Sequence, residues 1–429
     1  MRQRIFKILK AALSGAAAGV LTAVLVCLYK FFAHHIIYAS EKGYSLIREN
    51  LWLVLPAVVL LFAVALLLSK IYSRYKNLIG GGIPNAVAAA RGQLSLYCIR
   101  DSLGIFMLSL LSFLLGVPLG NEGPSVQMGA ASADGVARIF SRDKGFREQT
   151  VAAGACAGFA AATGAPLSGV AFCFDEIERK PRPALLFSCV WAVAACYITS
   201  RLICPVFKVE LSLFARPSLP AFSLKGLLVS AIVGVIFSVF SVVFLKLYKF
   251  LSFLYNKALG RLPLQLKIFI VLAIVFAFGL YSFSFISSGH ELSVSLFSKS
   301  APVFALALLL AARSCLSLSA NINGISGGTF IPIIAVGAAL AAILGRAASG
   351  VLGSQFYPLV LALGIVCCIA GMMKMPLVSV LFGFEVLFSA EQILYVVIAA
   401  AAAYALPALL KVNSINEEVL EKKLAKGSK

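Results

Sequence analysis

Long apolar runs recur from one end of the chain to the other. Examples are Ala11 to Cys27, Leu51 to Leu68, Leu227 to Leu245 and Ile268 to Ile286. Each is of the length, roughly 17 to 25 residues, that a helix needs to cross the hydrocarbon of a bilayer. The pattern predicts an all-α protein that crosses the membrane many times.

Other apolar segments are too short to cross alone and open with glycine or proline, such as Pro124 to Ile139 and Pro166 to Ile177. Interrupted helices of this kind occur in transporters where a substrate site lies at mid-membrane depth. We therefore expect a fold with many tilted and interrupted helices and a buried binding site.

Composition excludes a water-soluble fold. Of 429 residues, 61% are hydrophobic and 13% charged, whereas a soluble chain is typically about 25% charged. The first apolar run is better interpreted as a membrane helix than as a secretory signal. It continues beyond the usual signal core of roughly 7 to 15 residues, and it ends in Leu28-Tyr29-Lys30 without a small-residue cleavage site.

The charge is strongly positive, with 37 Lys and Arg against 17 Asp and Glu and a formal net charge of +20. In a soluble protein this balance would suggest nucleic acid as a partner. Here the basic residues cluster between apolar runs, as at Arg74–Lys76, Arg138–Arg147 and Arg179–Arg182, and at both termini. Such clusters are typical of cytoplasmic flanks, so we expect the lipid bilayer as partner, no nucleic acid, and both termini in the cytoplasm.

The ten cysteines stand singly apart from Cys367-Cys368, without CxxC or Cys/His spacing. This distribution indicates small buried hydrophobic residues. The three histidines, His34, His35 and His290, lie near segment ends. We predict no metal site and no cofactor.

One pattern occurs twice. The segment Gly120–Ala130 leads, some forty residues on, to Ala165–Phe172, and Gly328–Ala338 leads in the same way to Met375–Phe382. The two pairs are about 210 residues apart. Transporters are often built from two weakly similar halves of inverted topology, so this duplication predicts an inverted repeat.

The predicted organisation follows from this repeat. Residues 1–411 form the transmembrane transport domain, with repeats at about 45–205 and 220–411. Residues 412–429 form a final short helix and a cytoplasmic tail. We expect no soluble regulatory domain.

Three Gly/Pro clusters precede or open apolar helical runs: Gly80–Pro84, Gly120–Pro124 and Gly327–Pro332. Glycine lets the backbone come close to an ion, and proline suits the first helical turn. The first-turn N–H groups have no partner within their helix and carry the positive end of the helix dipole. If several of these N–H groups point to the same place, they can bind an anion without a formal positive charge. Partial charges also bind the anion weakly enough to release it.

Three carboxylates are candidates for chemistry or structure. Glu122 lies in an otherwise apolar stretch, where ionisable residues are usually functional; it either exchanges places with an anion on protonation or merely complements a helix dipole. Glu176, beside Asp175, is either a cytoplasmic proton entry point or part of a salt-bridged membrane boundary. Glu385 holds the matching place in the second half and is interpreted as structural.

Together these residues closely resemble the CLC family of chloride channels and chloride/proton exchangers. The three clusters are similar to its GSGIP, GKEGP or GREGP, and GxFxP signatures, in the same order, and the resemblance covers about residues 10 to 420. It implies transport of small inorganic anions, and a homodimer with one pore in each subunit.

The resemblance also implies roles for individual residues. Glu122 corresponds to the external gating glutamate, and Glu176 to the internal proton-transfer glutamate of exchangers, which channels replace by a nonpolar residue. The backbone amides implied to hold anions belong to two pairs of residues. These are Asn121 and Gly123 at the outer site and Thr329 and Phe330 at the central site.

Two positions depart from the family pattern at the central anion site. Gly81 stands where chloride-selective members have serine and nitrate-preferring members have proline, so Gly81 and Gly82 offer backbone groups only. Asn416 aligns with the tyrosine of the last helix, and its amide can still donate a hydrogen bond if it reaches the ion. Fluoride-exporting members typically have methionine at the position of Gly81. The sequence matches none of these patterns, so it does not identify the preferred anion.

The sequence thus predicts a proton-coupled anion antiporter, with chloride as the default anion, in a bacterial inner membrane. The alternatives are an uncoupled anion channel and a fluoride/proton antiporter of the same family. An intramembrane enzyme is disfavoured because no HExxH, GxSxG or paired-aspartate motif lies at membrane depth.

Overall fold

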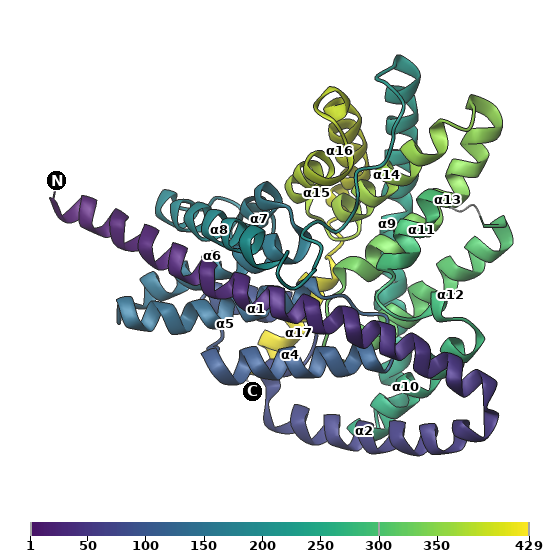
Figure 1. Ribbon diagram of the computed structural model, residues 1–429, viewed down its shortest axis with the longest axis horizontal. Coiled ribbons are helices and arrows are strands. Elements are labelled where there is room, and N and C mark those ends of the chain that lie inside the picture. The colour runs from purple at the N-terminus through teal and green to yellow at the C-terminus, as the bar shows by residue number, and fades with distance from the viewer. Residues whose placement is uncertain (1, 299–300, 428–429) are drawn as a thin grey trace.

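The computed structural model describes residues 2–298 and 301–427, and in these residues it contains seventeen α-helices and no β-strand (Figure 1). Eight helices are long and apolar enough to cross a membrane. Others, such as α14 and α15, are apolar but shorter. The all-α membrane fold with interrupted helices is confirmed.

The elements form two series followed by one last helix. The first series is α1 (Arg2–Glu49), α2 (Val54–Arg74), α3 (Ile83–Ala90), α4 (Cys98–Leu114), α5 (Glu122–Phe140), α6 (Lys144–Thr163), α7 (Pro166–Phe172) and α8 (Pro183–Ile203). The second series is α9 (Leu224–Leu259), α10 (Leu264–Tyr281), α11 (His290–Ser298), α12 (Val303–Ile322), α13 (Phe330–Leu352), α14 (Phe356–Gly371), α15 (Pro376–Phe382) and α16 (Ile393–Leu409). The last helix, α17 (Ile415–Gly427), is the yellow segment in Figure 1.

The two series match in their irregular parts as well. In each, the seven-residue helix that begins with proline passes into a single turn of π-helix, Cys173–Ile177 after α7 and Gly383–Leu387 after α15. Matching elements also meet: α2 packs on α10 and α7 packs on α15. These pairings are those of a repeat whose halves face one another about a pseudo-two-fold axis.

The centre of this arrangement is a contact between matching glycines. The Gly120 amide donates to the Gly328 carbonyl at 2.6 Å, and the Gly328 amide donates to the Gly120 carbonyl at 2.7 Å. Because these residues precede α5 and α13, the reciprocal pair holds the two helix N-termini side by side.

Small residues bring α5 and α6 into close backbone contact. A Cβ on Gly129 would collide with the backbone of Gly154, and one on Gly158 would collide with that of Ser125. Close-packed backbones of this kind are typical of helices that associate within a membrane. The packing fixes the position of α5 and therefore of Glu122 at its first turn.

Candidate functional site

The three Gly/Pro clusters that the sequence singled out come together in space. A Cβ on Gly82 would collide with the backbone of Gly123, and one on Gly123 would collide with the Gly81 carbonyl and lie 2.8 Å from the Cα of Gly328. Gly82 also has a φ of +85°, which favours glycine. Only glycine therefore fits where these segments meet. We call this close backbone contact between the three clusters the junction.

The helices that begin at this junction keep their first-turn N–H groups free. No side chain caps α3, α5 or α13. The amides of Gly123 and Phe330 donate no hydrogen bond to any described part of the chain. These groups carry the positive ends of their helix dipoles, so the junction has the donors that an anion requires.

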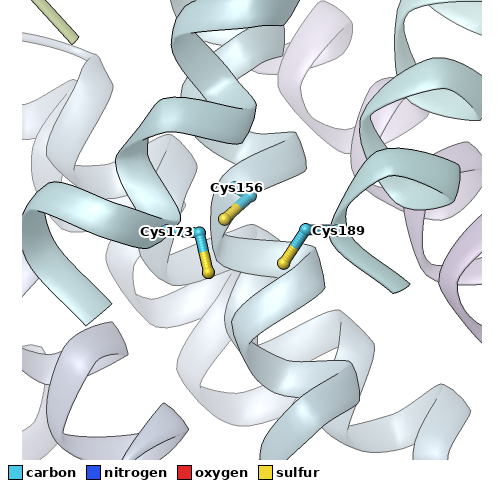
Figure 2. A group of neighbouring side chains, drawn as sticks. All are labelled: Cys156, Cys173 and Cys189. Carbon is cyan, nitrogen blue, oxygen red and sulfur yellow. The ribbon is translucent and has the colours of Figure 1, made fainter. Parts of the chain in front are cut away.

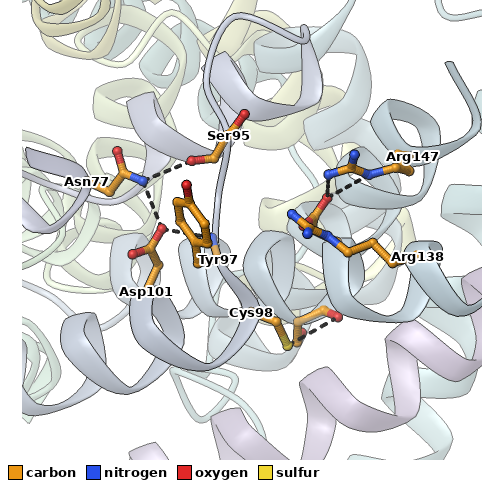
Figure 3. A network of polar contacts seen from close by, with 9 residues as sticks. Asn77, Ser95, Tyr97, Cys98, Asp101, Arg138 and Arg147 are labelled. Carbon is orange, nitrogen blue, oxygen red and sulfur yellow. Dashed lines mark hydrogen bonds and ion pairs between the residues drawn. The ribbon is translucent and has the colours of Figure 1, made fainter. Parts of the chain in front are cut away.

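A polar network holds the turn that leads into the first cluster (Figure 3). The Asn77 side chain donates to the Asp101 carboxylate at 2.8 Å and to the Ser95 carbonyl at 3.0 Å. The Asn77 carbonyl accepts from the side chains of Asn85 on α3 and Gln127 on α5, each at 2.8 Å. One residue therefore ties α3, α4 and α5 together beside the junction.

Glu122, at the first position of α5, is completely buried. Neither carboxylate oxygen makes a hydrogen bond of normal geometry in the described structure, but the backbone N–H groups of Glu122 and Ile331 lie against the carboxylate. Its Oε2 lies 2.6 Å from the point where a Cβ on Gly120 would stand, and the Ile331 amide nitrogen lies 3.3 Å from that point. The carboxylate thus occupies the space between the N-termini of α5 and α13. Burial of an ionised carboxylate is costly, and these N–H groups offset only part of that cost, which favours either protonation or replacement by another anion.

Thr329 and Phe330, the pair implied to hold the central anion, form the start of α13. Thr329 is the N-cap residue, and its side chain caps nothing. The Phe330 ring packs edge-on against Phe159 at 5.2 Å and Phe382 at 6.0 Å between centroids. This aromatic packing fixes the backbone whose amide N–H groups point to the junction.

On one side the junction adjoins a cavity of about 560 Å³ that Asn121 and Ile331 line. We name it the outer cavity after the orientation that the sequence predicts. Arg313 also lines this cavity although its side chain is completely buried. It donates to the carbonyls of Ser284 and Ser287 at 2.7 and 2.9 Å, and its Nε has no partner in the described structure. The lining also holds Lys30 and Lys208 and three carboxylates, those of Glu41, Glu210 and Glu291. Arg313 therefore adds positive charge locally, beside Ser284 and Ser287, and not over the whole cavity.

On the other side lies an inner cavity of about 320 Å³, lined by Pro84 of α3 and by Glu176 and Asn416. The Asn416 side chain donates to Glu176 Oε1 at 3.1 Å. Arg91, at the end of α3, donates to the Glu176 carbonyl at 2.8 Å and so holds the π-helical turn in place. The amide that the sequence suggested as an anion ligand is thus bonded to the proposed proton relay.

Two carboxylates cap the short helices reciprocally across the repeat. Glu385 accepts from the amides of Leu167 and Ser168 at the start of α7, at 2.6 and 2.9 Å. Asp175, its counterpart 210 residues earlier, accepts from the Val378 amide at the start of α15 at 2.8 Å. Each π-helical turn therefore stabilises the N-terminus of the other short helix. Glu385 was expected to be structural, whereas the cap by Asp175 was not predicted; the 210-residue offset that the two carboxylates share was the available signal.

Three cysteines that stand far apart in the sequence point toward one another in Figure 2. The sulfurs of Cys156 on α6, Cys173 at the π-helical turn and Cys189 on α8 lie within 4.8 Å of one another, and all three are buried. A thiol trio of this size can hold a soft metal ion such as Cu(I). This group was not predicted from the sequence, because the three cysteines come from different helices and show no local spacing pattern.

Fold and site together define a class: a membrane protein of two structurally matching halves with helix N-termini aimed at a buried carboxylate between two cavities. Comparison with known families agrees, since the voltage gated chloride channel family matches residues 61–408. The chain belongs to this family, the CLC family, and the resemblance seen in its sequence is confirmed.

Relatives and solved structures are consistent with this assignment. The chain is 26% identical to the H(+)/Cl(-) exchange transporter ClcA of Vibrio campbellii, over 96% of this chain and 89% of the relative. It is 28% identical to chloride channel protein CLC-f of Arabidopsis thaliana, over 63% of this chain and 37% of the relative. Its fold matches that of a slow cyanobacterial Cl−/H+ antiporter with a TM-score of 0.88, at 21% identity over 98% of this chain and 99% of the other. It also matches a CLC-type fluoride/proton antiporter with a TM-score of 0.71, at 18% identity over 93% and 95%.

Proposed function

We propose that this protein exchanges small inorganic anions, chloride by default, for protons across the membrane. The observation that carries the proposal is Glu122, a completely buried carboxylate at the meeting point of three helix N-termini that no side chain caps. An ionised Glu122 occupies the place of an anion, and a protonated Glu122 has no charge to hold it there. One side chain therefore gates the anion and carries the proton.

Glu176 is the internal proton relay in this proposal. It lines the inner cavity, and the hydrogen bond from Asn416 orients its carboxylate. The relatives named as exchange transporters support coupling to protons. Glu176 supports it as well, because the resemblance links a glutamate at this place with exchangers.

The proposed anion ligands are mainly backbone groups. They are those of Gly81, Gly82, Asn121, Gly123, Thr329 and Phe330. Gly81 has no side chain, and the Asn416 amide is bonded to Glu176. Neither of the two positions where the family resemblance implies a side-chain hydroxyl therefore supplies an anion ligand. An open central site favours an uncoupled channel as the second candidate function.

One experiment separates the two functions. The purified protein is reconstituted in liposomes, and a chloride gradient is imposed while internal pH is recorded. An antiporter moves protons against the direction of chloride, whereas a channel passes chloride and leaves the internal pH unchanged once the membrane potential is clamped. Competition by fluoride, nitrate and bromide in the same liposomes identifies the preferred anion.

We further propose a homodimer in a bacterial inner membrane with both termini in the cytoplasm. The family resemblance supports the dimer, the bacterial relatives support the membrane, and the basic clusters support the orientation. All residues proposed for the ion path belong to one chain, so each subunit would have its own path. Single-molecule photobleaching of labelled protein in liposomes counts the subunits directly.

A further inference from the structure

Two cysteines 177 positions apart in the sequence meet where α1 and α8 lie together. The Sγ of Cys27 on α1 is 2.7 Å from the Sγ of Cys204, which directly follows α8. Non-bonded carbon atoms pack at roughly 3.5–4.0 Å, and sulfur is the larger atom. A disulfide bond measures about 2.03–2.05 Å. The separation is thus shorter than a packing contact and about 0.7 Å longer than a disulfide. Both cysteines are free in this structure, and only a small shift separates them from bonding distance.

The surrounding structure keeps the two sulfurs in this position. Both residues are almost fully buried, Cys27 at 1% and Cys204 at 2% exposure. The backbones of α1 and α8 touch, since a Cβ on Gly15 would lie 2.6 Å from the Ser188 carbonyl oxygen. One turn after Cys27, Lys30 donates to the Leu211 carbonyl at 3.0 Å and ties α1 to the segment that follows Cys204. The thiols cannot separate without loosening these contacts.

Cys204 directly follows α8, whereas Cys27 lies near the middle of the long helix α1. With both termini in the cytoplasm, as proposed above, the end of α8 that bears Cys204 faces away from the cytoplasm. The basic segment Arg179–Arg182 precedes α8, and the basic N-terminal segment begins α1; such segments mark the cytoplasmic side. The segment after Cys204 lines the outer cavity with Phe207, Lys208 and Glu210. Disulfides form and persist in oxidising external compartments, and they are rare in the reducing cytosol.

We propose that Cys27 and Cys204 form a disulfide that fixes α1 to the segment bounding the outer cavity. The oxidant is a disulfide-bearing thiol oxidoreductase of the external compartment. Because both thiols are buried in the folded protein, the exchange takes place before α1 and α8 pack together. The Cys204 thiolate attacks the disulfide of the oxidoreductase, which forms a mixed disulfide and releases one thiolate. The Cys27 thiolate then attacks the Cys204 sulfur and displaces the second thiolate. Two protons leave the cysteines, and two electrons reduce the oxidant to a dithiol.

Thiol counting by intact mass tests this bond in the full-length protein. The protein is purified in detergent, unfolded, and alkylated with and without prior reduction. The chain has ten cysteines, so ten less the bonded two leaves eight alkyl groups before reduction and ten after it. A tryptic peptide linking Cys27 to Cys204 is expected in the unreduced sample only. Ten alkyl groups before reduction, or a linked peptide from another pair, would overturn the proposal.

Two variants and one stability measurement complete the test. The Cys27→Ser variant is expected to take up nine alkyl groups both before and after reduction. The matched control Cys315→Ser, at an exposed thiol, is expected to take up seven and then nine. Because closing a long loop constrains the unfolded chain, reduction should lower the Tm of the wild-type protein and of Cys315→Ser by several degrees. An unchanged wild-type Tm on reduction would contradict the role in fixing the two segments.

Discussion

A single methyl group added at Gly120 would meet the carboxylate of Glu122. The new Cβ would lie 2.6 Å from Glu122 Oε2 and 3.3 Å from Ile331, whereas a carbon normally approaches a carbonyl-type oxygen to about 3.3–3.6 Å. The carboxylate therefore has to move by roughly 0.7–1 Å. Overpacking of this kind costs about 1–3 kcal/mol, and only the closed state, with Glu122 in the junction, bears that cost.

The predicted result for Gly120→Ala is a gate that no longer closes fully. A closed state destabilised by about 1–3 kcal/mol loses a factor of roughly 5 to 150 in population. In liposomes the wild-type chloride flux should fall as pH rises, because ionised Glu122 then fills the site. The variant should keep a high flux at pH 8 and show a flatter pH profile.

The matched control is Gly350→Ala on α13, where an added Cβ meets nothing within 4 Å. Its pH profile should equal that of the wild type. If folded Gly120→Ala shows the same chloride flux and the same pH profile as Gly350→Ala, the position assigned to the Glu122 carboxylate is wrong.

Three further changes probe the surroundings of the gate. Glu385→Gln leaves one acceptor for the three hydrogen bonds that the carboxylate now accepts from Leu167 and Ser168, so the unfolding free energy should fall by about 2–4 kcal/mol and the Tm with it. Asn416→Leu removes the amide that orients the proton relay; a bond worth about 1 kcal/mol changes the population of the oriented Glu176 carboxylate roughly fivefold, so proton flux should fall relative to chloride flux. Burial lowers the pKa of Lys423 on α17 to about 8. The cost of burying its charge is therefore present below pH 8 and is lost as pH rises toward the unfolded value of about 10.4, so protease cleavage within α17 should slow between pH 7 and 9.

Each of these has a control and an opposing result. Exposed Glu391→Gln should leave the Tm unchanged, and a Glu385→Gln protein as stable as this control would contradict the cap. An unaltered proton-to-anion ratio in Asn416→Leu would remove Asn416 from the proton path. In Lys423→Met, protease cleavage within α17 should no longer slow between pH 7 and 9, because the charge is absent. Equal pH responses of this variant and the wild type would refute the assignment to Lys423.

The sequence predicted the repeat pattern and the Gly/Pro clusters because both rest on local chemistry. A backbone that must approach another backbone without side chains requires glycine, as at Gly82 and Gly123, and this requirement is visible in the sequence. Glu122 stood out for the same reason, since a carboxylate in an apolar stretch is costly unless it is used. The structure brings these clusters to one junction.

Contacts between distant segments could not be predicted in this way. The amide of Asn416 reaches Glu176, 240 residues away, only because α17 packs beside α3. The reciprocal cap of Asp175 on α15 depends on how the halves face one another. The cysteine groups depend on how α1, α6 and α8 pack, and thiols carry no spacing signal when each comes from a different helix.

The most direct test of the central claim is proton movement driven by a chloride gradient in liposomes that contain Glu122→Gln. We expect the variant to lose this proton movement and to retain chloride flux, because a neutral amide can neither ionise nor carry the proton. Glu291→Gln, an exposed carboxylate of the outer cavity, should couple like the wild type. Wild-type proton movement in Glu122→Gln would contradict the account.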